Sequence, residues 1–559
     1  MAADASADVI VVGSGAGGGA AAWALSRHGL RVLVLEAGPA FDAATDYRLD
    51  ASDWEQHGFP EKPGSRGRHG WAEGQPLDAR WAHLRTWNRQ TGPAVTGSRR
   101  IFGAYHHVRG VGGSTLHFTG EAHRLHPRAM RMRSDFGVAA DWPFGYDALE
   151  PWWLQAERIV GVAGAGADAH RPRSAPHPLP AHPSSFASRT LGEGVRAKGL
   201  TWTPNSLAVL SRPQDGRLAC NWCGQCQRGC PRADKGSVDV TFLRQARATG
   251  RCEVRALCRV TRVETGPGDR VTGVVWRDAS GATRRAPARA VIVACGAVET
   301  PRLLLLSGAG GAREGLANES GLVGRHFMET LAWTSVGMHP APIGSHRGLP
   351  SDSICWDFNA PDAIPGVVGG CRFSPATLEA GLAGPIHYAS RVIGGWGRAH
   401  KRALRERFGH ALAIGAIGES LPNPGSFVDL DPTLRDDDGA PLARIHSLLP
   451  ETELRRLDFM ARTAREILKA AGAGELVEEY GTWDTFSATH VFGTCRMGTD
   501  PRASVVDPFG ASHRWRNLFV CDASVFPSSG GGESPSLTIE ALALRSAEHL
   551  VERMRRGTL

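Results

Sequence analysis

The stretch that decides the fold is Asp8-Val9-Ile10-Val11-Val12, followed directly by Gly13-Ser14-Gly15-Ala16-Gly17-Gly18. A short apolar run that leads into a glycine-rich turn predicts a buried strand and then a change of direction. Residues 20–27 have the composition of a helix, and residues 31–36 form a second apolar strand that ends on Glu36. The three segments together predict a βαβ unit of the kind that binds a dinucleotide.

Each of three glycines in and after this turn has a physical role. Gly13 makes the tight turn, Gly15 lets the backbone approach a pyrophosphate, and Gly18 allows close packing of the helix. The helix N-terminus places its partial positive charge near the phosphates. Glu36 lies 23 positions after Gly13, where its carboxylate can accept the ribose hydroxyls.

The composition describes a globular chain with more than one core. The chain has 559 residues, of which 42% are hydrophobic and 21% charged, which excludes a disordered or fibrous protein. Its 69 glycines have no short period and cluster between apolar runs. Because no apolar run reaches about eighteen residues, we expect no membrane span and no ordinary secretory signal.

The charge balance does not indicate a nucleic-acid partner. The 64 basic and 56 acidic residues leave a net charge of +8. Arginine supplies most of the positive charge and is scattered rather than gathered into a stripe. Since nucleic-acid binding needs a basic face and a recognisable module, we expect no nucleic-acid partner.

The rest of the chain predicts mixed secondary structure. Residues 141–162 indicate a turn and an amphipathic helix, residues 254–276 a hairpin and residues 290–294 a buried strand. Between 330 and 450, apolar runs alternate with Pro/Gly turns, which predicts a separate antiparallel layer before a long amphipathic helix at 451–471. The predicted strands of this layer are 353–358, 387–393, 412–417 and 426–430.

Three further stretches carry a resemblance to a family. Val108 to Thr115 (VRGVGGST) and Gly296 to Gly308 (GAVETPRLLLLSG) are similar to two signatures of the glucose-methanol-choline oxidoreductases. His490 to Gly498 (HVFGTCRMG), with the following blocks at 505–507, 517–527 and 535–538, resembles the C-terminal block of that family. The chain is most similar to the bacterial branch of alcohol, sugar and polyol dehydrogenases.

The resemblance implies an α/β fold and an FAD cofactor. It implies a discontinuous Rossmann-like FAD-binding domain and a substrate domain with an antiparallel sheet. The FAD-binding segments would be 1–45, 95–140, 245–330 and 480–559, the excursions 46–94 and 141–244, and the substrate domain 331–479. The cofactor-binding residues would be Gly13, Gly15, Gly18, Glu36, Gly110, Gly112, Gly113, Ser114, His117, Asp522 and Ala523.

The resemblance also implies oxidation of an alcohol by hydride transfer to the flavin N5. A neutral histidine suits removal of the hydroxyl proton, and His490 matches the histidine that faces the flavin in the family. The family's second His or Asn falls on Ser534 here, with Glu533 beside it. A serine hydroxyl can hydrogen-bond the substrate oxygen but is not a second base, so either Ser534 or an inward-turned Glu533 remains a candidate.

His117 raises the question of a covalent flavin. In the pyranose-oxidising branch of the family, a histidine at the matching position is bonded to the 8α carbon of the flavin. Most relatives bind FAD without such a bond. Both a covalent link and a histidine that only packs beside the ring stay open.

Four cysteines form a run with ferredoxin-like spacing. Cys220, Cys223, Cys226 and Cys230 fit C-x2-C-x2-C-x3-C-P, a pattern that wraps an iron–sulfur cluster. We expect either a 3Fe-4S or 4Fe-4S cluster or a cluster-free structural loop, because zinc and two adjacent disulfides suit this spacing less well.

The leading hypothesis is an FAD-dependent alcohol dehydrogenase. Its partners would be a small-molecule alcohol and an external electron acceptor, namely an artificial acceptor, a quinone or a cytochrome subunit. An oxygen-using oxidase, a non-redox lyase of the same fold and an electron-transfer subunit remain alternatives. The expected compartment is the cytoplasm, or the periplasm after export with a partner subunit.

Overall fold

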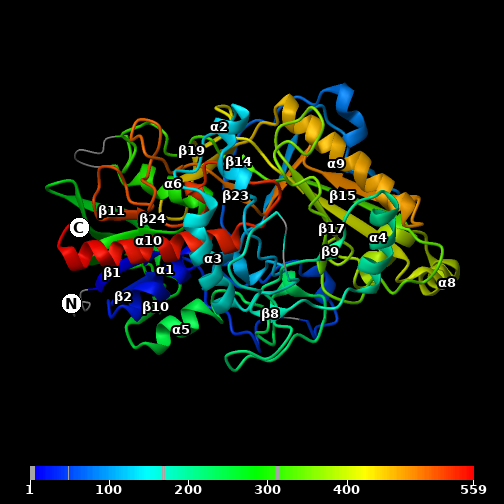
Figure 1. Ribbon diagram of the computed structural model, residues 1–559, viewed down its shortest axis with the longest axis horizontal. Helices are drawn as coiled ribbons and strands as arrows, with labels where there is room; N and C mark the ends of the chain where they lie inside the picture. Colours follow the sequence, from blue (N-terminus) through cyan, green and yellow to red (C-terminus); the bar gives the residue numbers. More distant parts are fainter. Residues whose placement is uncertain (1–6, 48, 167, 169, 309–313) are drawn as a thin grey trace.

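The computed structural model describes residues 7–47, 49–166, 168, 170–308 and 314–559. Two large sheets form separate layered regions, which lie side by side in Figure 1. Residues 1–6 of the first predicted FAD-binding segment lie outside the described residues, as do short parts of 141–244 and 245–330.

The first sheet has a parallel half and an antiparallel half, joined by one long strand. The C-terminal half of β13 pairs in parallel with β1 and β24, and its N-terminal half pairs with β12 in a meander. The strand order is β10-β2-β1-β13-β12-β11, with β24 beside β13. The bounds are β1 Ala7–Val12, β2 Val32–Leu35, β10 Cys252–Arg255, β11 Arg259–Gly266, β12 Arg270–Arg277, β13 Thr283–Val293 and β24 Leu518–Val520.

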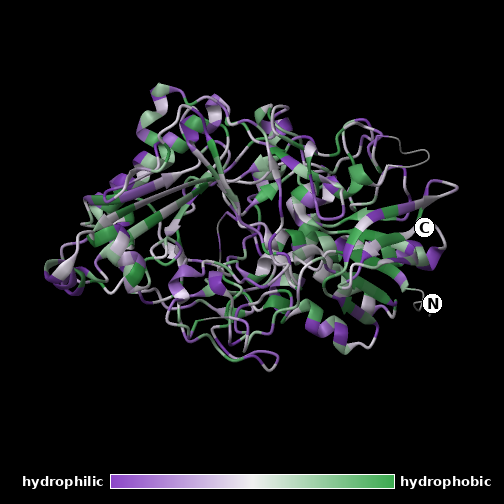
Figure 2. Cartoon of the chain, turned by 180° about the vertical axis from the view of Figure 1, so that it is seen from behind, coloured by the Kyte–Doolittle hydropathy of each residue, from purple (hydrophilic) through white to green (hydrophobic). Residues whose placement is uncertain are grey.

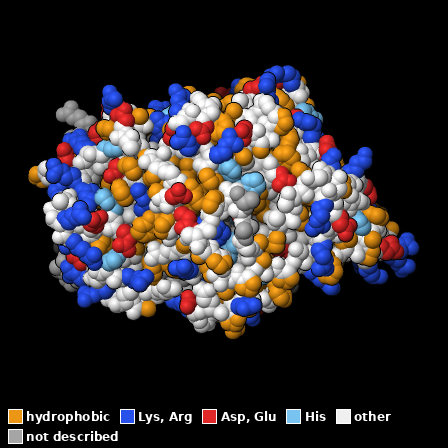
Figure 3. All heavy atoms as spheres, in the orientation of Figure 1, with side chains coloured by type: hydrophobic (Ala, Val, Ile, Leu, Met, Phe, Trp, Pro, Cys, Tyr) orange, Lys and Arg blue, Asp and Glu red, His pale blue; other side chains and the backbone are white. Residues whose placement is uncertain are grey.

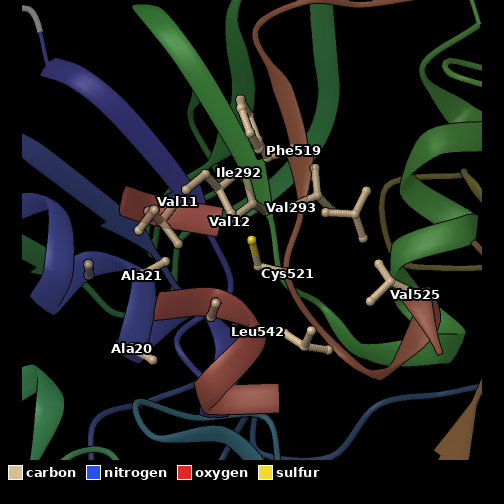
Figure 4. Close-up of a cluster of buried hydrophobic side chains, with 14 of the residues drawn as sticks. Val11, Val12, Ala20, Ala21, Ile292, Val293, Phe519, Cys521, Val525 and Leu542 are labelled. Atoms are coloured by element: carbon tan, nitrogen blue, oxygen red, sulfur yellow. The ribbon is translucent and has the colours of Figure 1, made fainter. Parts of the chain in front are cut away.

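Helices cover this sheet because its central strands are apolar on both faces. The residues of β1 are buried except Asp8, which is half-buried. Helix α1 (Ala16–Arg27) packs on α10 (Ser536–Arg556) and α5 (Phe242–Ala248), and α10 packs on α3 (Tyr146–Val160). Figure 4 shows side chains of α1, β13, β24 and α10 meeting in one core.

The second sheet is antiparallel, and helical segments pack on it. Its strand order is β17-β18-β15-β21-β4-β5. Helix α9 (Glu451–Ala470) packs on β15, β17 and β18, and α4 (Phe186–Ala197) packs on α9. Strands β15 and β18 are mostly apolar, whereas β21 carries three glutamates, and hydrophilic and hydrophobic residues mix over the helices of this region in Figure 2. The bounds are β4 Trp87–Asn88, β5 Gly92–Pro93, β15 Leu331–Met338, β17 Cys371–Pro375, β18 Ala411–Gly418 and β21 Glu475–Gly481.

Smaller elements connect the two regions. The remaining strands are β3 Gly70–Trp71, β6 Ile101–Tyr105, β7 Ala163–Gly164, β8 Leu179–Pro180, β9 Thr203–Pro204, β14 Met328–Glu329, β16 Ser353–Ile354, β19 Phe427–Arg435, β20 Pro441–His446, β22 Thr485–Ala488 and β23 Val491–Phe492. The remaining α-helices are α2 Met132–Phe136, α6 Gly296–Leu306, α7 Pro385–His387 and α8 Gly397–Arg407.

The predicted α/β class, with an antiparallel sheet in the second region, is confirmed. The domain bounds remain an interpretation, since the hairpin β19–β20 lies within 331–479 but packs on α6. The strand predicted at 387–393 is wrong, because α7 continues there into a π-helix at Tyr388–Ile393. Tyr388 and Val392 are both buried, and their spacing of four residues suits a helical face.

Two further strand predictions are only partly right. The strand expected at 353–358 ends at Ile354, and the next residue makes a single bridge to Phe373. The hairpin expected at 254–276 begins only at Arg259, because residues 252–255 form the parallel strand β10.

Within the described residues, no helix is long and apolar enough to cross a membrane. Basic and acidic side chains are interspersed over the face in Figure 3, without a basic stripe.

We predict that Gly18→Ala lowers the free energy of unfolding by about 1–3 kcal/mol, the usual cost of overpacking. A Cβ at Gly18 would collide with the carbonyl oxygen of Gly13, a backbone atom that cannot turn aside. Thermal unfolding of the variant and of Gly97→Ala measures the effect. Gly97 has open space around its Cα and no positive φ, so equal melting temperatures for the two variants would contradict the packing argument.

Candidate active site

A cavity of about 440 Å³ lies between the two sheets, within the range of small-molecule and cofactor sites. The β1–α1 turn and the loop at 108–119 line one part of it. Strands β15, β17 and β18 of the second sheet line another part, together with His490 and Ser534. The cavity therefore has one part built from the glycine-rich loops and another built on the antiparallel sheet.

The glycine-rich part forms a backbone cradle. Helix α1 follows Gly15, which contributes no side-chain cap, so the first N–H groups of the helix are left for an anionic ligand. Gly113, in the second glycine loop, has a φ of +56°, and a Cβ there would lie 2.7 Å from the Cα of Gly15. The two loops meet at a distance that side chains would prevent, and this fits the pyrophosphate of a dinucleotide.

Two buried carboxylates fix the ends of this cradle. Glu36 accepts hydrogen bonds from Ser14 N (3.0 Å), Ser14 Oγ (2.7 Å) and Gly38 N (2.9 Å), and it lines the cavity. Burial raises the pKa of Glu36. Asp522 accepts from Thr300 Oγ1 (2.5 Å) and also lines the cavity. Glu36 therefore lies at the cavity, and its contact with a ribose stays a prediction.

Most of the predicted cofactor-binding residues share this cavity. Gly13, Gly15, Glu36, Gly113, Ser114, His117, Asp522 and Ala523 line it. Gly18, Gly110 and Gly112 are not among the lining residues. Gly18 lies within α1, against the carbonyl oxygen of Gly13, and Gly110 and Gly112 lie in the second glycine loop.

His117 presents a neutral imidazole to the cavity. It is 5% exposed and follows the short 3-10 helix Gly113–Leu116. Its Nε2 has no hydrogen-bond partner among the described residues. Burial, and then the charge of Lys235, hold the pKa of His117 well below its usual value. The unprotonated ring nitrogen suits both readings of His117, a covalent flavin link and simple packing.

A backbone hydrogen bond holds His490 at the cavity. This residue precedes β23, and its carbonyl oxygen accepts from Thr330 N at 3.1 Å. The imidazole lines the cavity. Burial lowers the pKa of His490 to about 4, although the nearby Glu121 carboxylate opposes the shift. The ring is therefore neutral near pH 7, as a general base must be.

Ser534 lies in the same part of the cavity but is already engaged. Its Oγ donates to Glu121 Oε2 (2.9 Å), and its N–H donates to His123 Nδ1 (3.0 Å). His123 is buried, and burial lowers its pKa to about 4. The hydroxyl of Ser534 can still accept a hydrogen bond from a substrate hydroxyl.

Glu533 points away from the cavity. Its Oε1 accepts from His126 N, Arg171 Nη2 and Asn359 Nδ2, each at 3.0 Å. It is 2% exposed and does not line the cavity. This structural network argues against the catalytic role predicted for Glu533, and the neighbouring Ser534 faces inward instead.

Sequence reasoning missed three charged residues that line the cavity near His490. Glu121 and Arg372 form a buried ion pair, and Glu379 lies in the turn after β17. Only Glu121 has a local signal, because it follows the second glycine loop by eight positions. Arg372 and Glu379 reach the cavity through the pairing of β17 with β18.

The four cysteines keep the predicted spacing but not a ligand geometry. Among the described residues, no group of three or more His, Cys, Asp or Glu side chains is placed to hold a metal ion. Cys223 is exposed and Cys226 buried, and Cys230 donates to Asp234 Oδ1 at 2.9 Å. Burial raises the pKa of Cys220 to about 12, which keeps that thiol protonated. The side chains as placed do not fit an iron–sulfur cluster.

The cysteine run nevertheless touches the cofactor loop. Gln227, inside the run, lines the cavity. The buried Lys235 donates to Leu116 O (2.9 Å) and Phe118 O (2.9 Å), on either side of His117, and to Cys226 O (2.7 Å). One ammonium group thus fastens the cysteine run to the loop that carries His117.

Comparisons with known proteins agree with this geometry. Two profiles described as GMC oxidoreductase match residues 83–337 and 422–543, and one described as FAD binding domain matches residues 8–49. The chain is 29% identical to 2-methyl-1,2-propanediol dehydrogenase of Mycolicibacterium austroafricanum, over 98% of this chain and 95% of that protein. It is 28% identical to fructose dehydrogenase large subunit of Gluconobacter japonicus, over 99% of both chains.

Two further comparisons extend the likeness. The chain is 30% identical to paromamine 6'-oxidase of Streptomyces fradiae, over 97% of this chain and 90% of that one. The crystal structure of pyridoxine 4-oxidase from Mesorbium loti has the same fold, with a TM-score of 0.62 at 20% identity over 97% of this chain and 99% of that one.

We predict that Lys235→Met destabilises the protein by about 2–4 kcal/mol, because three buried carbonyl oxygens lose a charged donor. Thermal unfolding and the FAD content of the purified protein are the measurements. Lys198→Met is the matched control, since Lys198 makes a surface ion pair with Glu466 and its loss costs little. A Lys235→Met protein as stable as this control would show that the three contacts are not important for stability.

Proposed function

Because the chain belongs to the GMC oxidoreductase family, we propose that it is an FAD-dependent dehydrogenase that oxidises an alcohol group of a sugar, polyol or related alcohol. One observation carries the proposal above all. The neutral imidazole of His490 lines the same cavity as the glycine cradle. The candidate base and the candidate cofactor cradle share one cavity, which supports the proposal.

The division of labour follows from the positions of the groups. The FAD, when bound, supplies the acceptor for the hydride that leaves the carbinol carbon. His490 takes the hydroxyl proton at a ring nitrogen as negative charge develops on the substrate oxygen. The cationic imidazole that results lies near the Glu121 carboxylate, which interacts favourably with it.

Ser534 and Arg372 hold this carboxylate in place. Ser534 Oγ and Arg372 Nη2 both donate to Glu121 Oε2, and Asn205 Nδ2 donates to the other oxygen at 3.1 Å. Because all of these groups are buried, the carboxylate keeps its orientation while the imidazole gains and loses a proton. We propose that Ser534 also accepts a hydrogen bond from the substrate.

We propose that the electrons leave to an external acceptor, such as an artificial acceptor, a quinone or a cytochrome subunit. A relative over the full length of the chain is named as the large subunit of a fructose dehydrogenase, which supports a partner subunit. The proposal gives the cysteine run no part in this transfer, since no group of three or more His, Cys, Asp or Glu side chains among the described residues is placed to hold a metal ion. Iron and sulfide analysis of anaerobically purified protein tests the predicted cluster. The cellular compartment, cytoplasm or periplasm, remains a prediction.

Two measurements separate the alternatives. Peroxide formation during turnover in air would identify an oxidase, and an unchanged flavin spectrum with an alcohol in the absence of oxygen would favour a lyase. Acid precipitation distinguishes the two states of His117, because a covalently bound flavin stays with the pellet.

We predict that His490→Ala retains FAD but slows its anaerobic reduction by alcohol about a hundredfold to ten-thousandfold, the usual contribution of a general base. The decay of the oxidised flavin absorbance after mixing is the measurement. His28→Ala serves as the control because His28 is on the surface, where it pairs with Glu548. Reduction at the wild-type rate in His490→Ala would overturn the assignment of the base.

We predict that the reduction rate with a neutral alcohol declines only as the pH falls toward about 4. Burial lowers the pKa of His490 to about 4, so the imidazole stays neutral and competent down to that region. An unperturbed histidine would lose activity near about pH 6.5. A pH profile of flavin reduction with an acid limb near the unperturbed value would contradict the burial effect.

A further inference from the structure

We propose that the alcohol oxidised at this site carries an ammonium group, and that Glu379 together with Glu121 binds that group. The inference rests on the proposed function and names its substrate class, a protonated amino alcohol or amino sugar. It follows from the balance of charge in the part of the cavity built on the second sheet.

The charges that line this part are two acids and one base. Glu121, Glu379 and Arg372 are the charged residues there, and His490 and His123 are held neutral by burial. In the other part, several charged groups pair with one another, while Glu36 and Asp522 accept hydrogen bonds from neutral donors. Arg259 and Arg302 bind Asp436, and Arg302 also binds Glu299.

The single base is fully committed to partners other than Glu379. Arg372 donates from Nη2 to Glu121, from Nη1 to Ser374 Oγ, and from Nε to Gly532 O at 3.2 Å. Each nitrogen of the guanidinium therefore has an acceptor. Despite burial, the charge of Arg372 holds the pKa of Glu121 below its usual value; the same charge also acts on Glu379, whose pKa is nevertheless raised.

Glu379 is left with hydroxyl donors alone. Ser351 Oγ donates to its Oε1 at 2.8 Å, and the Thr119 hydroxyl also donates to it. Within the part of the chain that the structure describes, Glu379 makes no ion pair. Its side chain is exposed where it lines the cavity, and burial of its surroundings and then the Glu121 carboxylate raise its pKa to about 7.

A carboxyl group in this position favours a cationic ligand over a neutral one. Ionised Glu379 repels Glu121 and lacks the full solvation of bulk water, so a positive charge between the two carboxylates stabilises both. An ammonium group donates up to three hydrogen bonds, enough to reach both acids at once. Thr334, Ser374 and Gly415 on the sheet are small or hydroxylated, which leaves room for the hydroxyls of the same molecule.

The test compares matched alcohols on the FAD-loaded enzyme in the absence of oxygen. The pairs are 2-amino-1,3-propanediol with glycerol, and glucosamine with glucose, in which an amine replaces one hydroxyl. Simple primary alcohols without an amine complete the panel. The proteins are the wild type, Glu379→Gln, Glu379→Asp and, as a control for the same change on the surface, Glu466→Gln, each checked for FAD content and melting temperature.

We expect the wild type to reduce its flavin more efficiently with the amine of each pair. Glu379→Gln should lower the preference for the amine, as the ratio of the two kcat/KM values, about tenfold to a hundredfold, the scale of a hydrogen bond to a charged group. Glu379→Asp should retain part of the preference, because it keeps the charge, and Glu466→Gln should retain all of it.

Each other outcome has a distinct meaning. Equal or better reduction by the neutral members, with a preference unchanged in Glu379→Gln, overturns the ammonium site while leaving the dehydrogenase intact. Reduction by simple alcohols but by no amine overturns it as well. Failure of every alcohol to reduce the flavin overturns the proposed function itself.

Discussion

The structure depends on the contact of two glycine-rich loops that have no side chains between them. Gly15 and Gly113 bring their backbones together because neither carries a Cβ, and a Cβ on Gly113 would lie 2.7 Å from the other backbone. From this contact, a single segment continues past His117 to Glu121 and lines the cavity along the way. The position of the cofactor cradle and the position of the carboxylate near His490 are therefore set by one stretch of chain, so a displacement of the loop would move both.

Burial of charge then decides what this cavity can do. The imidazoles of His117, His123 and His490 all lose affinity for protons chiefly through desolvation, so the site is supplied with neutral bases. The positive charges near these imidazoles are Arg372, which donates a hydrogen bond to Glu121, and Lys235, which donates one to Cys226 O. A fixed cation near a histidine favours the neutral form of that histidine. The arrangement suits the oxidation of an alcohol, in which a proton leaves the hydroxyl group and a hydride leaves the carbinol carbon.

The amino-acid sequence predicted what depends on local pattern. The βαβ unit follows from an apolar run, a glycine turn and Glu36 at a fixed spacing, and the structure reproduces it. His490 and Ser534 lie at the cavity because their motifs are short and rigidly placed. The sequence could not distinguish Glu533 from Ser534, since residues 530–535 form no helix or strand and no periodic pattern shows which of the two side chains lines the cavity. The helical turn at 388–393 was read as a strand because it holds aromatic and β-branched residues, whereas its buried positions are four apart.

The residues that the sequence did not reveal are those whose role arises only from long-range pairing. Arg372 and Glu379 stand in segments with no recognisable motif, and β17 brings them to Glu121 across about 250 residues of chain. Their role depends on all three residues together. The two acids lie near one arginine, and that arginine forms its ion pair with Glu121. Such an imbalance cannot be read from composition, because the chain as a whole carries an excess of positive charge. The imbalance becomes visible only when burial and hydrogen bonds show which charges are paired. The chain as a whole is positive, whereas the part of the cavity on the second sheet holds two acids and one base.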